Sequence, residues 1–377
     1  MKYMGSKRSM LQNGLGKLII EQSQNSDRFV DLFCGAGYVS WFVAENTNLP
    51  VYSIDLQSFS VILSKSIIGR DIPLQSVELC KKWLYLVEQE RKKTVLWKSA
   101  TELESSNREI AQIVADSRNL CLQLSNVGPI WNAYGGYYFS PTQALTIDYM
   151  ISMLPENENE KIVCLAAIIS TATKCVAAPG HTAQPFQPTK SAGKFIEISW
   201  GLDPITLCEK ELTAICPRYA RKIGSAIVAD ALEIAPTLKP TDLVFIDPPY
   251  SDVQYSRFYH VLETIARSES IVVSGVGRYP PITDRPQSTF SRRGDSLSSL
   301  RTLLTNLRYT GATLIFTFPK GESSNGLSGD VVRNIASEMY SVQEQIISGR
   351  FSTLGGNNSR RSSRVISNEM ILTMKPR

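Results

Sequence analysis

The chain has 377 residues, of which 43% are hydrophobic, so it can form one large α/β core with an insertion, or two domains. Its net charge of +5, from 40 basic and 35 acidic side chains, is a mild bias that is compatible with a polyanionic partner without requiring one. It contains no apolar run long enough to span a membrane, and its seven scattered cysteines form no Cys-x-x-Cys pair. We therefore expect no membrane anchor, secretory leader, disulfide framework or metal site, but reduced thiols in the cytoplasm.

The chain begins with a basic segment, residues 1–8, that reads Met-Lys-Tyr-Met-Gly-Ser-Lys-Arg. Gly5 and Ser6 favour a loop with exposed backbone N–H groups, and Lys7 adds a positive charge beside it. Apolar residues at helical spacing follow from Leu11. Taken alone, the segment is more typical of a flexible basic terminus than of a binding site.

Residues 28–37 read Arg-Phe-Val-Asp-Leu-Phe-Cys-Gly-Ala-Gly, which predicts a short strand, a glycine turn and a helix over 38–44. Gly35 and Gly37 let the backbone approach a bound ligand, with the helix N-terminus pointing at it. Ser40 replaces the third glycine of the dinucleotide-binding pattern, which argues against a nicotinamide cofactor.

A second strand is expected over residues 50–55, and it ends in Asp55, twenty residues after Gly35. A carboxylate at this place can accept hydrogen bonds from the ribose hydroxyls of an adenosyl group. The alternative is a surface residue that caps the helix beginning near Ser58. The spacing favours the ribose role.

Residues 70–220 differ in character and read as a mainly helical insertion. Amphipathic periodicity predicts helices over 77–90, 102–116, 142–154 and 162–173. A loop over 126–140 is dense in glycine and aromatic residues and contains Tyr137. Loops on a rigid frame commonly carry recognition surfaces, although clustered aromatic residues are more often simply buried.

Strand patterns return after the insertion. They cover residues 226–230, 243–247, 313–318, 342–347 and 369–375. Strands that alternate with helices predict an α/β fold with a mostly parallel, doubly wound sheet. We expect the last two strands to form an antiparallel hairpin at the edge of the sheet.

The central motif, residues 243–250, reads Leu-Val-Phe-Ile-Asp-Pro-Pro-Tyr. Its apolar residues suit a buried strand, and the two prolines end that strand and place Asp247 at its carboxyl end. A carboxylate and a rigid carbonyl can accept both N–H groups of an amino group on a flat base, and Tyr250 can stack on that base. The alternative is an ordinary strand followed by a Pro-Pro turn.

Two further features follow the motif. His260 could accept a proton, but we expect it to pack or to position a neighbour. The irregular segment 275–295 carries Arg285, Arg292 and Arg293, which are candidates for phosphate contacts. A solvated mobile loop explains these arginines equally well.

Together these motifs resemble the Dam-type group of N6-adenine-specific DNA methyltransferases, in their residues and in their order along the chain. The resemblance implies a Rossmann-like fold and S-adenosylmethionine as the cofactor. It implies a cofactor site made of Tyr3, Met4, Gly5, Lys7, Asp31, Phe33, Gly35, Gly37, Asp55, Asp230 and Ala231. It implies a catalytic group made of Asp247, Pro248, Pro249 and Tyr250, with DNA contacts from Tyr137, Arg285, Arg292 and Arg293.

The same resemblance predicts how the chain is organised and what it does. Residues 1–69 and 221–377 would form the catalytic domain, and 70–220 the target-recognition domain. The expected activity is direct methyl transfer to adenine N6 of a base flipped out of double-stranded DNA, in a restriction–modification or phage-defence system with a cognate nuclease. Cytosine-N4 or RNA-adenine methylation, an inactive nucleic-acid-binding relative and protein-glutamine methylation are alternatives. The recognised sequence and the oligomeric state do not follow from the sequence.

Overall fold

The computed structural model describes residues 7–124, 126–352 and 364–377. For residues 348–352 and 364–367 it describes the backbone only. Contacts divide these residues into two compact units. The helical unit comprises 73–218 and 257–285, and the sheet unit comprises the residues up to 72, 219–256 and 286–377. The helical unit thus takes in segment 257–285, which the sequence analysis assigned to the catalytic domain.

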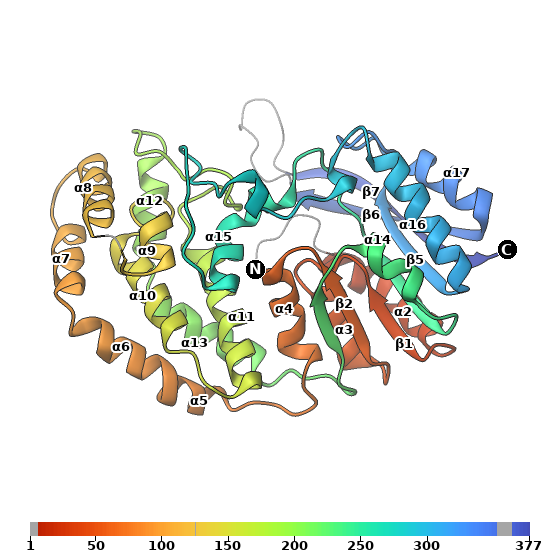
Figure 1. The fold of residues 1–377 in the computed structure, drawn as a ribbon, viewed down its shortest axis with the longest axis horizontal. Helices are drawn as coiled ribbons and strands as arrows, with labels where there is room; N and C mark the ends of the chain where they lie inside the picture. The colour runs from red at the N-terminus through yellow and green to blue at the C-terminus, as the bar shows by residue number, and fades with distance from the viewer. Residues whose placement is uncertain (1–6, 125, 353–363) are drawn as a thin grey trace. The chain divides into compact units, whose positions relative to one another are not determined.

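The sheet unit is built on seven strands. They are β1 (Arg28–Asp31), β2 (Val51–Asp55), β3 (Ser225–Val228), β4 (Asp242–Ile246), β5 (Thr313–Pro319), β6 (Tyr340–Ser352) and β7 (Arg364–Pro376). The order is β3-β2-β1-β4-β5-β7-β6, in which the first five strands are parallel and β7 runs antiparallel to both of its neighbours (Figure 1). The predicted mostly parallel α/β sheet and its antiparallel edge hairpin are therefore confirmed.

The strand register brings three carboxylates to one edge of the sheet. Asp31 is the last residue of β1 and pairs with Phe245 of β4, two residues before Asp247. Asp55 is the last residue of β2. Because the carboxyl ends of parallel strands meet at the same edge, all three side chains lie where open α/β sheets bind their ligands.

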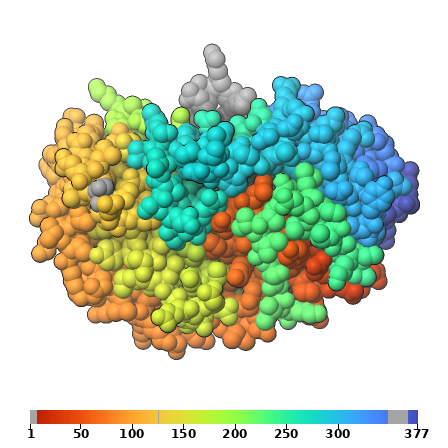
Figure 2. All heavy atoms as spheres, in the orientation of Figure 1, coloured from red at the N-terminus to blue at the C-terminus, as the bar shows by residue number. Residues whose placement is uncertain are grey.

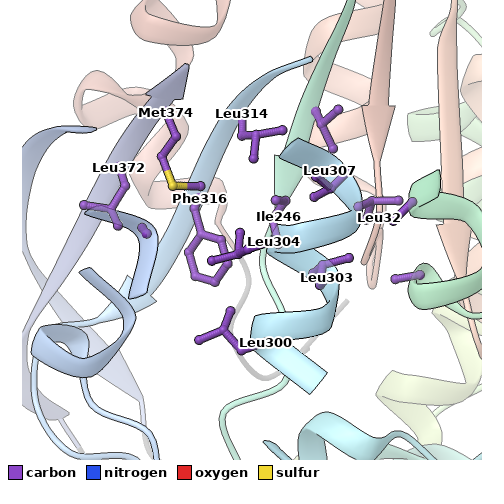
Figure 3. Packing of buried hydrophobic residues seen from close by; sticks show 14 of the residues in the cluster. Leu32, Ile246, Leu300, Leu303, Leu304, Leu307, Leu314, Phe316, Leu372 and Met374 are labelled. Atoms are coloured by element: carbon purple, nitrogen blue, oxygen red, sulfur yellow. The ribbon is translucent and has the colours of Figure 1, made fainter. Parts of the chain in front are cut away.

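Helices of the sheet unit cover both faces of the sheet. They are α1 (Arg8–Met10), η1 (Leu11–Leu15), α2 (Gly16–Ser23), α3 (Tyr38–Asn46), α4 (Ser58–Ile68), α14 (Ala231–Ile234), η3 (Ala235–Thr237), η5 (Thr289–Ser291), α16 (Ser296–Thr310) and α17 (Gly329–Met339). Figure 3 shows the leucines of α16 packed against Ile246, Leu314 and Phe316. Successive side chains of a strand point to opposite faces of the sheet, and one face of β1 and β2 packs against α3 and α4. On this face Asp31 of β1 and Ser53 of β2 are both hydrogen-bonded to Ser40 of α3.

The helical unit contains only helices and loops among its described residues. They are α5 (Ser76–Leu79), η2 (Cys80–Leu84), α6 (Tyr85–Lys92), α7 (Val95–Glu104), α8 (Ile110–Gln123), α9 (Pro129–Tyr134), α10 (Pro141–Ser152), α11 (Glu158–Cys175), α12 (Gly193–Trp200), α13 (Pro204–Ile215), most of α15 (Tyr255–Arg267) and η4 (Ile282–Asp284). No helix in the described part of the chain is both long and apolar enough to cross a membrane.

One helix predicted in this region is wrong. The expected helix over 102–116 is two helices, because α7 ends at Glu104 and α8 begins only at Ile110. The intervening Ser-Ser-Asn sequence favours a turn, since short polar side chains bond to nearby backbone groups in place of the helical ladder. Ser106 does so here, and its hydroxyl donates to the carbonyl of Leu103 at 2.7 Å.

Candidate active site

A cleft of about 960 Å³, counting its open mouth, lies at the carboxyl ends of β1, β2 and β4 in the sheet unit. Eleven of the residues assigned to the cofactor or to catalysis line it. They are Lys7, Asp31, Phe33, Gly35, Asp55, Asp230, Ala231, Asp247, Pro248, Pro249 and Tyr250. Gly37 does not line the cleft, and Tyr3, Met4 and Gly5 lie outside the described residues.

The two glycines of the loop after β1 have different roles. Gly35 lines the cleft, whereas Gly37 forms the turn into α3 with φ +78°, and its N–H donates to the Cys34 carbonyl at 2.8 Å. A Cβ at position 37 would lie 3.0 Å from the Trp41 ring and 3.2 Å from the Cα of Ser64. Gly37 is therefore required by the left-handed backbone and by close packing, not by a ligand contact.

Asp31 is a buried carboxylate with a well-formed hydrogen bond to only one of its two oxygens among the described residues. Ser40 donates to its Oδ2 at 2.6 Å, and Ser53 in turn donates to Ser40 at 2.8 Å. Oδ1 is buried and lacks a well-formed hydrogen bond among the described residues. Burial raises the pKa of Asp31 to about 7, although the Ser40 hydroxyl and the nearby N–H of Phe33 oppose the shift. A cation bound in the cleft beside Oδ1 would restore the ionised form.

Asp55 ties two cleft loops together. Its Oδ2 accepts the N–H of Gly35 at 2.9 Å, and its Oδ1 accepts the N–H of Gln57 at 2.9 Å. The second bond forms the turn that leads into α4, so part of the capping role considered above is present. Each carboxylate oxygen can accept further hydrogen bonds, so the side chain also remains able to bind hydroxyl groups in the cleft.

Asp230 and Ala231 stand at the corresponding place after β3. Oδ1 of Asp230 accepts the N–H of Leu232 at 2.8 Å and so caps α14, whose first residue is Ala231. Both residues line the cleft. The carboxyl ends of β1, β2, β3 and β4 thus all contribute an acidic residue or its neighbour to one cavity.

Asp247 is held through one of its two oxygens. Its Oδ1 lies 3.0 Å from the Nζ atom of Lys7 and accepts the hydroxyl of Thr317 at 2.9 Å. Nζ of Lys7 also lies 3.1 Å from Oε2 of Glu369 on β7, and the side chains of Lys7 and Glu369 are each 3% exposed. No residue in the described ranges bonds Oδ2 of Asp247, which leaves this oxygen available in the cleft.

The charges around Asp247 set its protonation state. Burial raises the pKa of Asp247 to about 6, with Glu369 acting in the same direction and Lys7 opposing it. Burial also disfavours the charged form of Lys7, but Asp247 and Glu369 raise the pKa of its ammonium above the ordinary value. With a pKa of about 6, Asp247 is therefore mostly ionised at neutral pH, beside a charged Lys7 ammonium.

Tyr250 and the proline pair are fixed by aromatic and amide contacts. The ring of Tyr250 meets Phe318 edge to face at 6.3 Å, and Nζ of Lys7 lies 5.8 Å from its centroid. The buried Asn325 donates its side-chain amide to the carbonyls of Pro249 and Phe290, each at 3.1 Å. These contacts hold the backbone after β4 in one conformation, and the partly buried Tyr250 lines the cleft.

A two-point clamp closes the rim of the cleft. The side-chain amide of Gln254 donates to the carbonyl of Ser288 at 2.8 Å and accepts the N–H of Ser288 at 2.7 Å. Both residues line the cleft. Between them the chain leaves the sheet unit at Ser256 and re-enters it at Pro286.

The model of one protein family, described as D12 class N6 adenine-specific DNA methyltransferase, matches residues 3–118 and 211–291, just over half of the chain. The chain belongs to this family. Two curated relatives are similar to it: modification methylase StsI of Streptococcus sanguinis, 25% identical over 84% of this chain and 44% of the relative, and modification methylase LlaI of Lactococcus lactis subsp. lactis, 24% identical over 82% and 45%. The chain spans less than half the length of these relatives.

Membership of the D12 class confirms the resemblance read from the motifs. The matched segments contain the glycine loop, Asp55, Asp230 and Asp247, so the family's signal falls on the cleft. Thr317, Asn325 and Glu369 lie beyond the matched segments, and sequence reasoning missed all three. No local signal identifies them, because each is a single polar residue brought to Asp247 or its loop by strand pairing or by a distant turn.

The four candidate DNA contacts fall in different parts of this D12 family member. Arg292 and Arg293 are exposed in the loop before α16, whose light-blue surface is visible in Figure 2. Arg285 and the half-buried Tyr137 belong to the helical unit, where two arginines, Arg118 and Arg278, lie 4.4 and 4.6 Å from the Tyr137 ring. Arg292 is also 3.6 Å from Asp295.

His260 is a packing residue of the helical unit. Its ring is 2% exposed and contacts Tyr134, Tyr138 and Tyr279. Burial lowers the pKa of His260 to about 4, so the ring is neutral. The expectation that it packs rather than acts as a base agrees with these contacts, and it does not line the cleft.

Proposed function

We propose that this chain transfers a methyl group from S-adenosylmethionine to the N6 amino group of adenine in double-stranded DNA. The observation that carries the proposal is the position of Asp247 in the same cleft as Asp31 and Asp55, with Oδ1 fixed and Oδ2 unbonded by any residue that the structure describes. The family supports the target atom, and the names of the relatives support a place in a restriction–modification system with a companion nuclease.

The donor set of the cleft fits S-adenosylmethionine. The unsatisfied Oδ1 of Asp31 suits the positively charged amino group of the methionine part. Asp55 suits the ribose hydroxyls, and Asp230 with Ala231 suits the edge of the adenine ring. Phe33 and Gly35 would pack along the ligand. When bound, the cofactor supplies an electrophilic methyl group on a sulfonium sulfur.

Lys7 has contacts that point to a different role from the one implied by the resemblance. Its ammonium is engaged by Asp247 and Glu369, so it serves the catalytic carboxylate rather than the methionine end of the cofactor.

The chemistry of the target explains the remaining residues. The lone pair of an exocyclic amino group is shared with the base, so the nitrogen is a poor nucleophile. In our proposal Oδ2 of Asp247 accepts one N–H and the Pro248 carbonyl accepts the other, which orients the nitrogen and stabilises the positive charge that develops on it. Tyr250 stacks on the base. Because a base within a duplex cannot reach Asp247, it must be flipped out, at a cost of a few kcal/mol.

The test is a comparison of Asp247→Ala with a matched control, Asp252→Ala, which removes an exposed carboxylate five residues further along. Methyl incorporation from labelled S-adenosylmethionine into duplex DNA is measured, and the product is digested to nucleosides. We expect N6-methyladenine from the parent and the control, and a rate lower by about 10²–10³-fold for Asp247→Ala, the usual loss when one transition-state contact is removed.

The product also decides between the proposal and its alternatives. If the product is N4-methylcytosine, or if only RNA is methylated, the same cleft acts on a different target. An Asp247→Ala protein that methylates adenine at the parent rate would refute the assignment of Asp247. Calorimetric titration with S-adenosylmethionine provides the folding control, because Asp247→Ala is expected to retain cofactor binding.

A further inference from the structure

Glu369 is a buried acid with no place in the mechanism described so far. It lies on β7, opposite Pro319 of β5 and Ile347 of β6, and it does not line the cleft. Its Oε2 is 3.1 Å from Nζ of Lys7, which is 3.0 Å from Oδ1 of Asp247. The Lys7 ammonium therefore links the carboxylate of Glu369, in the antiparallel part of the sheet, to the carboxylate of Asp247.

A lysine on its own would work against the proposed chemistry. Asp247 stabilises the target nitrogen because it is negative, and an ammonium 3.0 Å away cancels most of that charge. A second carboxylate on the far side of the ammonium restores a net charge of −1 to the group. It also holds the ammonium at Oδ1, so that Oδ2 is kept for the substrate.

The lysine is needed in turn because two buried carboxylates cannot both remain ionised without a cation between them. Without Lys7, one of the two acids would take up a proton at neutral pH. If that acid were Asp247, it could no longer accept the N–H of the target. Glu369 and Lys7 therefore support Asp247 only when both are present.

We propose that Glu369 is a positioning residue for methyl transfer, which holds the Lys7 ammonium at Oδ1 of Asp247, so that Oδ2 is kept for the target and the group keeps a net negative charge beside the target nitrogen. This inference rests on the proposed function of the cleft. Glu369 touches neither the cofactor nor the base, so its removal changes the rate of transfer and not the affinity for S-adenosylmethionine.

The two partners of Asp247 predict opposite changes in the pH profile. Loss of the Glu369 charge lowers the pKa of Asp247, because Glu369 is one of the groups that raise it. Loss of the Lys7 charge raises the pKa of Asp247, because Lys7 opposes the effect of burial. The other groups that face Asp247 are the Tyr250 hydroxyl and Asp31. Saturating cofactor keeps the state of Asp31 constant during the measurement.

The experiment measures kcat against pH from 5 to 8 at saturating cofactor and DNA. The variants are Glu369→Gln, Lys7→Met and the double variant, with Glu338→Gln as a control that removes an exposed acid paired to Arg301. We expect the acidic limb to move to lower pH in Glu369→Gln, to higher pH in Lys7→Met, and back towards the parent in the double variant. At pH 8 the kcat of Glu369→Gln falls by about ten- to a hundredfold, with cofactor affinity within about twofold of the parent.

Two results would overturn the inference. One is a Glu369→Gln protein with the parent's kcat and pH profile, and the other is a limb that moves in the same direction in both single variants. Lys7→Arg is a second test that preserves the charge, and it should keep the limb near that of the parent.

A titration that does not depend on activity separates this inference from the proposed function. Carbon-13 spectra of protein labelled at the aspartate carboxyl carbon follow Asp247 directly, with Asp247→Asn to assign its signal. If the parent methylates no nucleic acid, the proposed function fails, whereas opposite shifts of the Asp247 signal would still establish the three-charge group. Unshifted titrations in folded Glu369→Gln and Lys7→Met proteins would refute that group.

Discussion

We predict that the protonation state of Asp31 makes the affinity for S-adenosylmethionine depend on pH. Burial raises the pKa of this carboxyl to about 7, whereas a cationic amino group binds only to its ionised form. Below pH 7 the free protein must therefore release a proton before it binds S-adenosylmethionine. The dissociation constant is expected to rise as the pH falls, by a factor that follows from the fraction of Asp31 that is ionised.

The size of the effect can be worked out from that pKa. With a value of about 7, Asp31 is about three-quarters ionised at pH 7.5 and roughly one-thirtieth ionised at pH 5.5. The ionisation of Asp31 alone would therefore increase the dissociation constant about 25-fold between these two values. An ordinary α-amino group has a pKa of about 7.7–8.0, so the amino group of the cofactor is only about two-thirds protonated at pH 7.5, and the expected increase is about 17-fold.

Isothermal titration calorimetry from pH 5.5 to 7.5 measures this dependence. At pH 6, titrations in two buffers with different ionisation enthalpies should show release of about 0.9 proton per cofactor bound by the parent. Asp31→Asn should bind more weakly at pH 7.5 and should lose both the slope and the proton release. Asp252→Asn, which removes an exposed carboxylate, is the matched control and should keep them. An Asp31→Asn protein with the parent's slope would show that another group senses the pH, and the cation site would have to be placed elsewhere.

Three further variants test other parts of the structure. Gly37→Ala should lose about 1–2 kcal/mol of folding free energy because of its left-handed backbone, and a further amount because the new methyl group would press against Trp41 and Ser64. In the control, Gly294→Ala, the methyl group meets nothing within 4 Å, so the loss should be much smaller. Equal losses of folding free energy in urea denaturation would contradict this account. Asp148 accepts the N–H groups of Ile130 and Trp131, and burial raises its pKa to about 7. The folded protein thus holds this proton more tightly than the unfolded chain, so the stability that it contributes is complete below about pH 4 and is lost as the pH rises through 7. The parent should lose about 2 kcal/mol more than Asp148→Asn between pH 5.5 and 8, and parallel stability curves would rule this out. Arg292→Ala with Arg293→Ala should reduce the slope of log affinity for DNA against log salt by about 1–2, with Arg301→Ala as the control; an unchanged slope would remove both residues from the DNA interface.

The sheet and most of the cleft could be predicted because they depend on short stretches of sequence. Alternating and continuous apolar runs located all seven strands, and parallel pairing then brings Asp31, Asp55 and Asp247 to one edge without further information. The antiparallel hairpin was also recognisable, since it consists of the last two apolar strand patterns in the sequence.

The partners of Asp247 could not be predicted, because their positions depend on pairing across the whole sheet. Thr317 reaches Asp247 through the pairing of β5 with β4, and Glu369 reaches Lys7 through the antiparallel addition of β7. A single threonine or glutamate carries no periodic signal. The motif singled out Lys7, but its proximity to Asp247 could not be read from the sequence.

The helix predictions were wrong at two places because a local signal in the sequence was overlooked. The serines after Glu104 divide the helix expected over 102–116, and their preference for turns is visible in the sequence. Asp203 followed by Pro204 is a strong helix start, and α13 begins there with the Asp203 side chain accepting two backbone N–H groups. No helix was predicted at that position.

The clamp between Gln254 and Ser288 has a consequence for the length of the chain between them. The stretch of chain that departs after Ser256 and returns at Pro286 has its two ends pinned at neighbouring points by a pair of hydrogen bonds. Because the entropy of closing a loop grows only slowly with its length, insertions within that stretch add little to the cost of folding. The length of this stretch can therefore change while the distance between its two ends stays the same.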